Sequence, residues 1–307
     1  MTAAQSPGRI TVSGLTKQYR TVRAVDNLSF TVEPGRVTGF LGPNGSGKTT
    51  TLRMLLGLVR PTGGSATIDG RPYASLRQPL RHVGAVLEAS GAHQGRTGRN
   101  HLRMICAAAG FPYRRADEVL ELVGLAPAAK RKFKGYSLGM RQRLGIAAAM
   151  LGDPRVLILD EPANGLDPEG IRWMRDLLKA LAGQGRTVLV SSHLLSEMQV
   201  LADDVVIIAN GRLVRQAPMA EILDTLGQAR RVRVRTPHAD ALVKALPTPE
   251  ASVATEPDGA LTVAGLEAAE VGRVALAAGV ELHELTPERP DLERVFLELT
   301  AGKAGIR

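Results

Sequence analysis

The sequence has almost no cysteine. Among its 307 residues only Cys106 is a cysteine, which excludes an internal disulfide and a metal cage built from cysteine ligands. Its neighbours, residues 107–109, are all alanine, so a buried core position is favoured over a reactive one.

Long hydrophobic runs are also absent. Hydrophobic residues make up 44% of the chain, which supports a substantial core. No run approaches the roughly 18 uncharged apolar residues that a membrane span requires. Residues 1–8 contain neither the basic nor the apolar segment of an export signal. We therefore expect a cytoplasmic protein.

Acidic residues are scarce in the middle third. Residues 71–143 contain 14 lysines and arginines against 4 aspartates and glutamates, a local charge of +10 in a chain whose net charge is +9. A solvated surface is the ordinary interpretation of such a segment. Attraction to an anionic membrane leaflet and binding of nucleic acid are the functional alternatives, and composition alone does not choose between them.

A glycine-rich stretch is the strongest motif in the chain. It matches G-x-x-x-x-G-K-[ST] without a mismatch, between an apolar run and a helix-patterned run. Glycines allow backbone N–H groups to curl around a phosphate, and the following helix N-terminus adds its dipole. Lys48 would neutralise β- and γ-phosphate oxygens, and the Thr49 hydroxyl would hold Mg²⁺. An ordinary glycine-rich turn is the alternative, which the complete pattern disfavours. We predict a nucleoside triphosphate site formed by Gly42, Pro43, Asn44, Gly45, Ser46, Gly47, Lys48, Thr49 and Thr50.

Two acidic residues, Asp160 and Glu161, follow the apolar run 156–159. A run of this kind is expected for a strand buried on both faces of a parallel sheet, and ligands bind at the carboxyl ends of such strands. We interpret Asp160 as a Mg²⁺ ligand and Glu161 as the residue that orients or deprotonates an attacking water. A solvated strand end is the less favoured alternative.

Two further side chains are candidates because of their positions. His193 follows the apolar strand 187–190 and two serines, so it should lie at the same sheet edge as Asp160. A γ-phosphate contact is therefore favoured over a simple polar cap. Tyr19 lies in the N-terminal strands, where it is either an exposed strand aromatic or a stacking platform for a purine ring.

The order of elements predicts an α/β protein. Short strands are expected at 10–12, 22–25 and 28–32, with a turn at Asp26-Asn27, and further strands at 65–69 and 82–87. Residues 97–151 have helical periodicity, and Asn210-Gly211 is a two-residue hairpin signal.

The C-terminal part has a different pattern. After a connecting helix, alternating strands and helices follow the order βαββαβ, which suggests a small ferredoxin-like module ending in a strand at 280–285 and a helix at 291–299. No catalytic motif occurs there, so a stabilising or dimerising appendage is favoured over a ligand sensor.

With these motifs in view, the chain resembles the ATP-binding subunits of ABC transporters. Residues 136–143, Tyr-Ser-Leu-Gly-Met-Arg-Gln-Arg, are similar to the family signature, whose common form is L-S-G-G-Q-x-Q-R. The departures at Tyr136, Leu138 and Met140 resemble the daunorubicin/doxorubicin-resistance and bacitracin-export branch. Residues 164–167 are similar to the D-loop, His193 to the switch histidine and Tyr19 to the A-loop aromatic residue.

The resemblance implies a fold, a mechanism and partners. The expected fold is a P-loop NTPase core of ABC type, with an antiparallel β subdomain and a helical insertion, plus a small C-terminal α+β module. Two subunits would sandwich two ATP, each ATP meeting Ser137 and Gly139 of the other copy. Integral membrane permease subunits would carry the exported substrate, and the chain would lie at the cytoplasmic face of the membrane. Glu88 occupies the Q-loop position, where many members have glutamine, and is a candidate Mg²⁺ contact.

The expected domain limits follow from these motifs. The ATP-binding domain should span 8–217, with the helical subdomain at about 90–150, the connecting helix at 218–229 and the accessory module at 230–307. The competing hypothesis is a non-transport ABC ATPase acting on nucleic acid or ribosomes. Such proteins usually contain two ATPase modules or long coiled coils, neither of which occurs here, so no nucleic-acid partner is expected.

Overall fold

The computed structural model describes residues 7–87, 91–193, 195–227, 231–247 and 251–287. Contacts between Cα atoms divide these residues into two compact units, the first ending at Pro218 and the second beginning at Met219. Each unit is described by itself. None of the helices in the described ranges is long and apolar enough to cross a membrane.

The first unit is built on a six-stranded sheet in the order β5-β6-β7-β3-β8-β9. Neighbouring strands are parallel except β9, which pairs antiparallel with β8. Every residue of β3, β6 and β7 is buried, as their continuous apolar runs predicted. The strands are β3 (Val37–Leu41), β5 (Val83–Val86), β6 (Val156–Asp160), β7 (Thr187–Ser192), β8 (Asp204–Ala209) and β9 (Arg212–Pro218).

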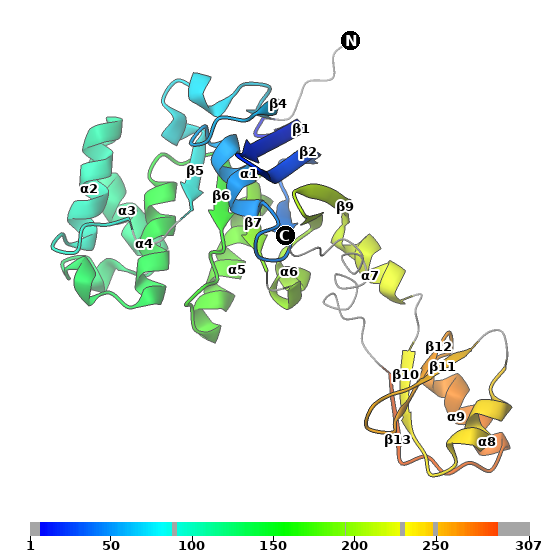
Figure 1. Cartoon of the computed structure of the whole chain (residues 1–307). Helices are drawn as coiled ribbons and strands as arrows, with labels where there is room; N and C mark the ends of the chain where they lie inside the picture. Colours follow the sequence, from blue (N-terminus) through cyan, green and yellow to red (C-terminus); the bar gives the residue numbers. More distant parts are fainter. Residues whose placement is uncertain (1–6, 88–90, 194, 228–230, 248–250, 288–307) are drawn as a thin grey trace. The chain divides into compact units, whose positions relative to one another are not determined.

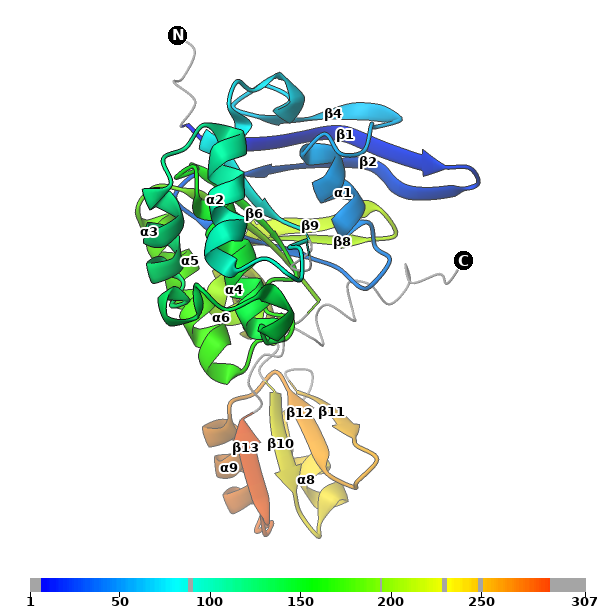
Figure 2. The same cartoon turned by 90° about the vertical axis from the view of Figure 1, so that its left-hand side faces the viewer.

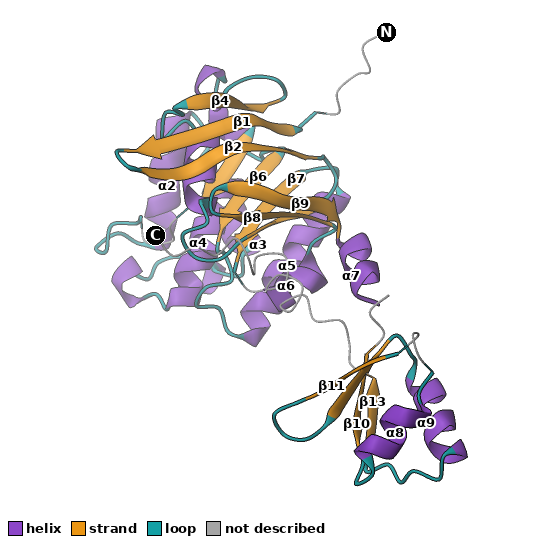
Figure 3. Cartoon of the chain, turned by 45° about the vertical axis from the view of Figure 1, so that its right-hand side comes forward, coloured by secondary structure: helices purple, strands orange, loops and turns teal. Residues whose placement is uncertain are grey.

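Helices and a second sheet cover the two faces of this sheet (Figures 1 and 3). The Phe40 ring stacks on Phe30 of the second sheet, with centroids 5.3 Å apart. A Cβ atom on Gly39 would point to the opposite face, where it would lie 3.4 Å from Met198 Sδ and 3.3 Å from Ala202 Cβ. The covering helices are α1 (Lys48–Leu55), α5 (Pro168–Gly183) and α6 (Leu195–Leu201).

The second sheet is antiparallel, in the order β2-β1-β4 (Figure 2). Its strands are β1 (Ile10–Tyr19), β2 (Val22–Val32) and β4 (Gly63–Ile68). The expected turn at Asp26-Asn27 is wrong: β2 continues through it, with an irregular register against β1. Asn27 adopts the left-handed conformation at φ 50°, and its N–H donates to the Thr16 hydroxyl at 3.0 Å. The polar pair therefore forms a bulge within one strand.

The predicted helical insertion is present, and local sequence sets its helix ends. The Thr97 hydroxyl accepts the Asn100 N–H at the start of α2, and Gly110 ends that helix at φ 68°. Its helices are α2 (Gly98–Ala109), α3 (Arg114–Leu122) and α4 (Leu138–Met150). Single 3₁₀ turns occupy Tyr73–Ser75, Pro79–Arg81, Ala126–Ala128 and Phe133–Gly135.

The second unit begins with α7 (Met219–Gly227) and then has the predicted βαββαβ order. Its sheet is antiparallel in the order β11-β12-β10-β13, with α8 and α9 on one face (Figure 3). This is the ferredoxin-like arrangement, and its core is separate from that of the first unit. The elements are β10 (Arg231–Arg235), α8 (Ala239–Ala245), β11 (Ser252–Thr255), β12 (Leu261–Ala264), α9 (Ala268–Ala277) and β13 (Glu284–Pro287).

The last strand begins later than the predicted 280–285. Gly279 is left-handed at φ 65°, and its N–H donates to Leu276, while the Val280 N–H donates to Ala275. These bonds form a Schellman motif at the end of α9, so Val280 is buried as a helix-terminating residue rather than in a strand. The predicted helix 291–299 lies outside the described residues.

Candidate nucleotide site

The glycine-rich loop joins β3 to α1 at the carboxyl edge of the sheet. Its outer part, residues 43–45, is exposed, whereas Gly42, Ser46 and Gly47 are buried. The Ser46 N–H donates to Pro43 O at 3.1 Å, which closes the turn. The Ser46 hydroxyl is buried without a hydrogen-bond partner among the described residues. The loop thus presents open backbone around a polar interior, as a phosphate site requires.

Two of the glycines are required by space. A Cβ atom at Gly42 would lie 2.6 Å from the Ile208 carbonyl oxygen, and one at Gly47 would lie 2.5 Å from the Ala24 carbonyl oxygen. Gly47 also has φ 103°, which other residues rarely adopt. The glycines of the motif therefore allow β2 and β8 to pack tightly behind the loop.

Lys48 is the cation of the site, and it is nearly buried. Its Nζ donates to Gly42 O at 2.7 Å and lies 3.7 Å from the Glu161 carboxylate. Burial lowers the pKa of Lys48, and the charges of Glu161 and Asp160 partly oppose this effect. A bound polyphosphate would place further negative charge beside the Lys48 ammonium group. This charge would raise the pKa of Lys48 and so counteract the effect of burial.

Thr49 and Asp160 form the predicted oxygen pair. The Thr49 hydroxyl donates to Asp160 Oδ2 at 2.7 Å, and the Ser191 hydroxyl donates to Asp160 Oδ1. A hydroxyl and a carboxylate suit Mg²⁺, which prefers oxygen ligands and usually takes only one or two from protein beside substrate phosphates. The residues therefore fit the ion.

Glu161 and His193 form a pair beside Lys48. Glu161 Oε2 lies 2.7 Å from His193 Nδ1, while Oε1 faces Lys48. Glu161 is left-handed at φ 49°, and its N–H donates to both the backbone and the hydroxyl oxygen of Ser191. Residues held in sparsely populated conformations concentrate at functional sites. The structure thus brings Lys48, Thr49, Asp160, Glu161 and His193 into one cluster.

The signature residues lie elsewhere. Ser137 caps α4 by accepting the Met140 N–H at 3.2 Å, and both Ser137 and Leu138 are exposed. Gly139 faces Leu166 instead. Among the described residues, no hydrogen bond or ion pair links Ser137 to the phosphate loop.

Comparison with known proteins agrees with this geometry. A family model described as ABC transporter matches residues 25–164. The bacitracin transport ATP-binding protein BcrA of Bacillus licheniformis is 46% identical over 212 residues, 68% of this chain and 69% of the relative. The daunorubicin/doxorubicin resistance ATP-binding protein DrrA of Streptomyces peucetius is 36% identical over 310 residues, 97% of this chain and 94% of the relative. The chain belongs to the ABC transporter family.

A solved ATP-binding subunit of an ABC transporter has the same fold. It aligns with a TM-score of 0.64 at 28% identity and covers 71% of this chain and 93% of its own. This confirms the predicted ABC-type core. The chain is accordingly an ATP-binding and ATP-hydrolysing subunit of an ABC transporter. A second family model, a domain of unknown function (DUF8746), matches residues 230–293 in the C-terminal unit.

Two predicted ABC-type contacts are less defined. Tyr19 is 45% exposed at the end of β1, and Lys17 Nζ lies 4.9 Å from its ring centroid. Its ring is therefore accessible to a base, and stacking on adenine stays a prediction. Glu88 lies outside the described residues, so its role as a Mg²⁺ contact also stays a prediction.

Sequence reasoning missed two supports of this ABC site. Ser191 holds Asp160 through its hydroxyl and Glu161 through its acceptors. Gly211 donates its N–H to Ser46 O and accepts the Asp26 N–H, which fastens the β8–β9 turn to the phosphate loop and β2. The Asn-Gly pair did predict the hairpin, but nothing in that pair indicates what the turn contacts.

Proposed function

We propose that this chain is the ATPase of a drug- or antibiotic-exporting ABC transporter. Two copies would pair around two ATP molecules and act on integral membrane subunits from the cytoplasmic face. The bacitracin-transport and daunorubicin/doxorubicin-resistance relatives support the substrate class. The same relatives disfavour the nucleic-acid alternative. Residues 8–217 would form the ATPase domain and 230–307 an accessory module.

One observation carries the proposed pairing. Lys48, Glu161 and His193 contribute to one side of a phosphate site, while the exposed, Ser-capped helix start at Ser137 forms no hydrogen bond or ion pair with that site within the described part of the chain. The first N–H groups of a helix lack intrahelical partners and attract anions. A second copy would bring this helix start to the open side of the γ-phosphate, next to the exposed loop residues 43–45.

The residues of the cluster have distinct roles in the proposed reaction. Lys48 binds β- and γ-phosphate oxygens, and their negative charge stabilises the ammonium group that burial disfavours. Glu161 accepts a hydrogen bond from the attacking water and orients it, or takes its proton. His193, 2.7 Å from Glu161, keeps that carboxylate in place and reaches the γ-phosphate from the same edge. Ser137 and Gly139 of the second copy would complete the donors around the phosphate.

Mg²⁺ would be held by Thr49 and Asp160. When bound, the ion neutralises developing charge on the β- and γ-phosphate oxygens. Ser191 fixes the Asp160 carboxylate for this purpose, because its hydroxyl donates to the carboxylate oxygen that Thr49 leaves free.

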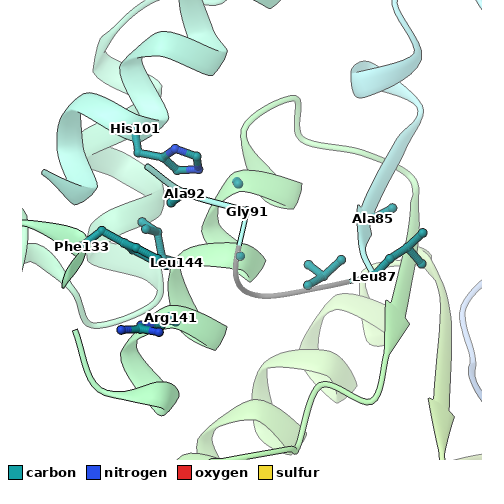
Figure 4. Close-up of a pocket in the computed structure, with 11 residues that line it drawn as sticks. Ala85, Leu87, Gly91, Ala92, His101, Phe133, Arg141 and Leu144 are labelled. Carbon is teal, nitrogen blue, oxygen red and sulfur yellow. The ribbon is translucent and has the colours of Figure 1, made fainter. Parts of the chain in front are cut away.

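A pocket beside the helical insertion is suited to the membrane subunit (Figure 4). It has a volume of about 160 Å³, with Ala85 and Leu87 on one side and His101 and Phe133 on the other. His101 Nδ1 and Arg141 Nε are buried without hydrogen-bond partners among the described residues. An apolar segment bearing an acceptor would fill the pocket and satisfy these atoms.

The helical insertion also has a basic surface, which suits a position near an anionic leaflet. Its exposed basic residues include Lys130, Arg131, Lys132 and Lys134.

Replacing Glu161 by glutamine tests the pairing and the chemistry together. Glu161→Gln removes the base but keeps its size, so the variant should bind ATP, form a stable dimer and turn over almost no ATP. Size-exclusion chromatography with ATP and an assay of phosphate release measure both properties. A variant that stays monomeric with saturating ATP would show that the sandwich is wrong for this chain.

Two controls make this result specific. Glu161→Gln combined with Lys48→Ala should be monomeric with ATP, because the phosphate contact is lost. Glu121→Gln, which neutralises an exposed glutamate on α3, should keep wild-type turnover and the wild-type elution volume.

Docking of the membrane subunit is tested at Ala148, which lines the pocket. Ala148→Arg should block association with integral membrane permease subunits co-expressed with this chain, while the ATPase rate of the isolated chain is retained. Ala180→Arg, at an exposed position of α5, is the matched control and should leave co-purification unchanged. Equal recovery with both variants would exclude this pocket as the docking site.

A further inference from the structure

The first residue of α4, Leu138, lies directly over a glycine of the D-loop. A Cβ atom on Gly165 would overlap Leu138 Cδ2 and Cγ, and would lie 3.2 Å from Leu138 Cβ. Gly165 also has φ 78°, in the left-handed region. The leucine stands where the common family signature has glycine, so this contact comes from one of the chain's own departures. Its side chain nevertheless stays 54% exposed.

A second contact follows one helical turn later. Gln142 is only 6% exposed, and its Nε2 donates to the Asn164 carbonyl oxygen at 3.2 Å. Residues four apart lie on the same helix face, so Leu138 and Gln142 grip the same loop. Between them, a Cβ atom at Gly139 would lie 3.4 Å from Leu166 Cδ2. The start of α4 and residues 164–166 therefore pack as one piece.

This loop leads back to the catalytic carboxylate through short hydrogen-bonded turns. The Asn164 N–H donates to Glu161 O at 3.2 Å, and the Leu166 N–H donates to Ala163 O at 3.1 Å. The loop ends at Asp167, whose carboxylate accepts the Gly170 N–H at 2.8 Å and starts α5. A displacement of Leu138 would thus be transmitted to Glu161 through a hydrogen-bonded segment only a few residues long.

We propose that Leu138, assisted by Gln142, is a positioning residue that couples the two ATP sites. This rests on the proposed pairing, in which Ser137 serves the partner's nucleotide while Glu161 serves the chain's own. When the partner's ATP fixes the start of α4, Leu138 fixes residues 164–166 and thereby Glu161. Each subunit then hydrolyses its ATP efficiently only when its neighbour is also loaded, which produces positive cooperativity in turnover.

The first test is the ATP dependence of hydrolysis in Leu138→Ala. Wild type should show a Hill coefficient of about two, the number of sites, and the variant a value of about one. The variant's kcat should fall several-fold while the ATP affinity of the monomer is unchanged. Leu138→Met, which refills the space, should restore cooperativity. Leu122→Ala, at an exposed leucine of α3, should behave like wild type. A Leu138→Ala curve that matches wild type would overturn the proposal.

The second test separates coupling from simple interface packing. In the Glu161→Gln background, Leu138→Ala should still form the ATP-stabilised dimer. If it does not, Leu138 acts as an interface contact and the coupling role is wrong. If Glu161→Gln alone is monomeric with ATP, the pairing itself fails and the inference fails with it.

The third test uses the contact itself. Gly165→Ala should lower kcat because the new Cβ overlaps Leu138. Adding Leu138→Ala should recover part of that loss, although the strain at φ 78° remains. The two substitutions are in contact, so their effects should not multiply. A double variant no faster than Gly165→Ala would contradict the contact, and thermal melting confirms that each variant is folded.

Discussion

Individual hydroxyl groups near the site differ in their partners, and this difference sets their expected importance. The Ser191 hydroxyl donates to Asp160 and accepts the Glu161 N–H. Thr38, on β3 of the same sheet, is also buried, but its hydroxyl has no partner among the described residues. A hydroxyl that serves two catalytic residues should therefore matter far more than one of equal burial that serves none.

We predict that Ser191→Ala lowers the ATPase rate at least about tenfold, because a hydrogen bond to a charged group contributes about 1.5–3 kcal/mol. ATP binding, measured by fluorescent-nucleotide titration, should weaken much less, since Lys48 and the loop are untouched. Thr38→Val is the matched control and should retain the rate with an equal or higher melting temperature. Similar rates for the two variants would show that Ser191 does not hold the site.

At this scale the sequence predicted the cluster better than its supports. Lys48 could be placed because it belongs to a complete motif. Asp160 and Glu161 could be placed because they follow an apolar run, and parallel strands end at one edge of a sheet. Ser191 could not be recognised, since a serine at a strand end has no distinguishing pattern. The left-handed backbone of Glu161 was equally hidden, because it depends on the Ser191 acceptors on the neighbouring strand.

At the scale of elements, the phosphate loop depends on how closely β2 packs behind it. Gly45 and Gly47 both have positive φ angles, 80° and 103°. A Cβ atom on Gly45 would meet nothing within 4 Å, whereas one on Gly47 would lie 2.5 Å from the Ala24 carbonyl oxygen. The two positions thus share backbone strain and differ in the space available.

Gly47→Ala should accordingly destabilise the protein more than Gly45→Ala. The second substitution incurs mainly the strain of a positive φ, of order 1–3 kcal/mol. The first also forces β2 away from the loop, so it should abolish nucleotide-induced stabilisation. Thermal melting with and without ATP measures both effects. Equal melting temperatures would mean that the contact with Ala24 carries no weight.

The types of the elements were predictable where the hydrophobic periodicity or the turn residues gave a strong local signal. The predictions were wrong where tertiary contacts decided the structure. The Asn210-Gly211 hairpin and the helical insertion follow from local signals. Asparagine is common in turns, yet the Asn27 N–H donates to the Thr16 hydroxyl and Asn27 lies within a continuous strand. Valine is common in strands, but the Val280 N–H donates to Ala275 O, which places Val280 at the C-terminus of α9.

At the scale of the whole molecule, the chain contains two units with separate hydrophobic cores. Only the first contains the nucleotide cluster. Units whose cores share no residues can unfold as separate cooperative transitions. A ligand that binds one unit stabilises that unit alone. ATP should therefore raise the midpoint temperature of one of two calorimetric transitions and leave that of the other unchanged.

A substitution in the second core tests this independence. Val234 is fully buried in β10, so Val234→Asp places an unpaired carboxylate in the core and should abolish the second transition. Val243 on α8 is 39% exposed, and Val243→Asp should leave that transition nearly unchanged. In both variants the first transition should keep its ATP-induced shift, and the ATPase rate of the isolated chain should stay near that of wild type. A loss of ATPase activity with Val234→Asp alone would show instead that the second core supports the catalytic unit.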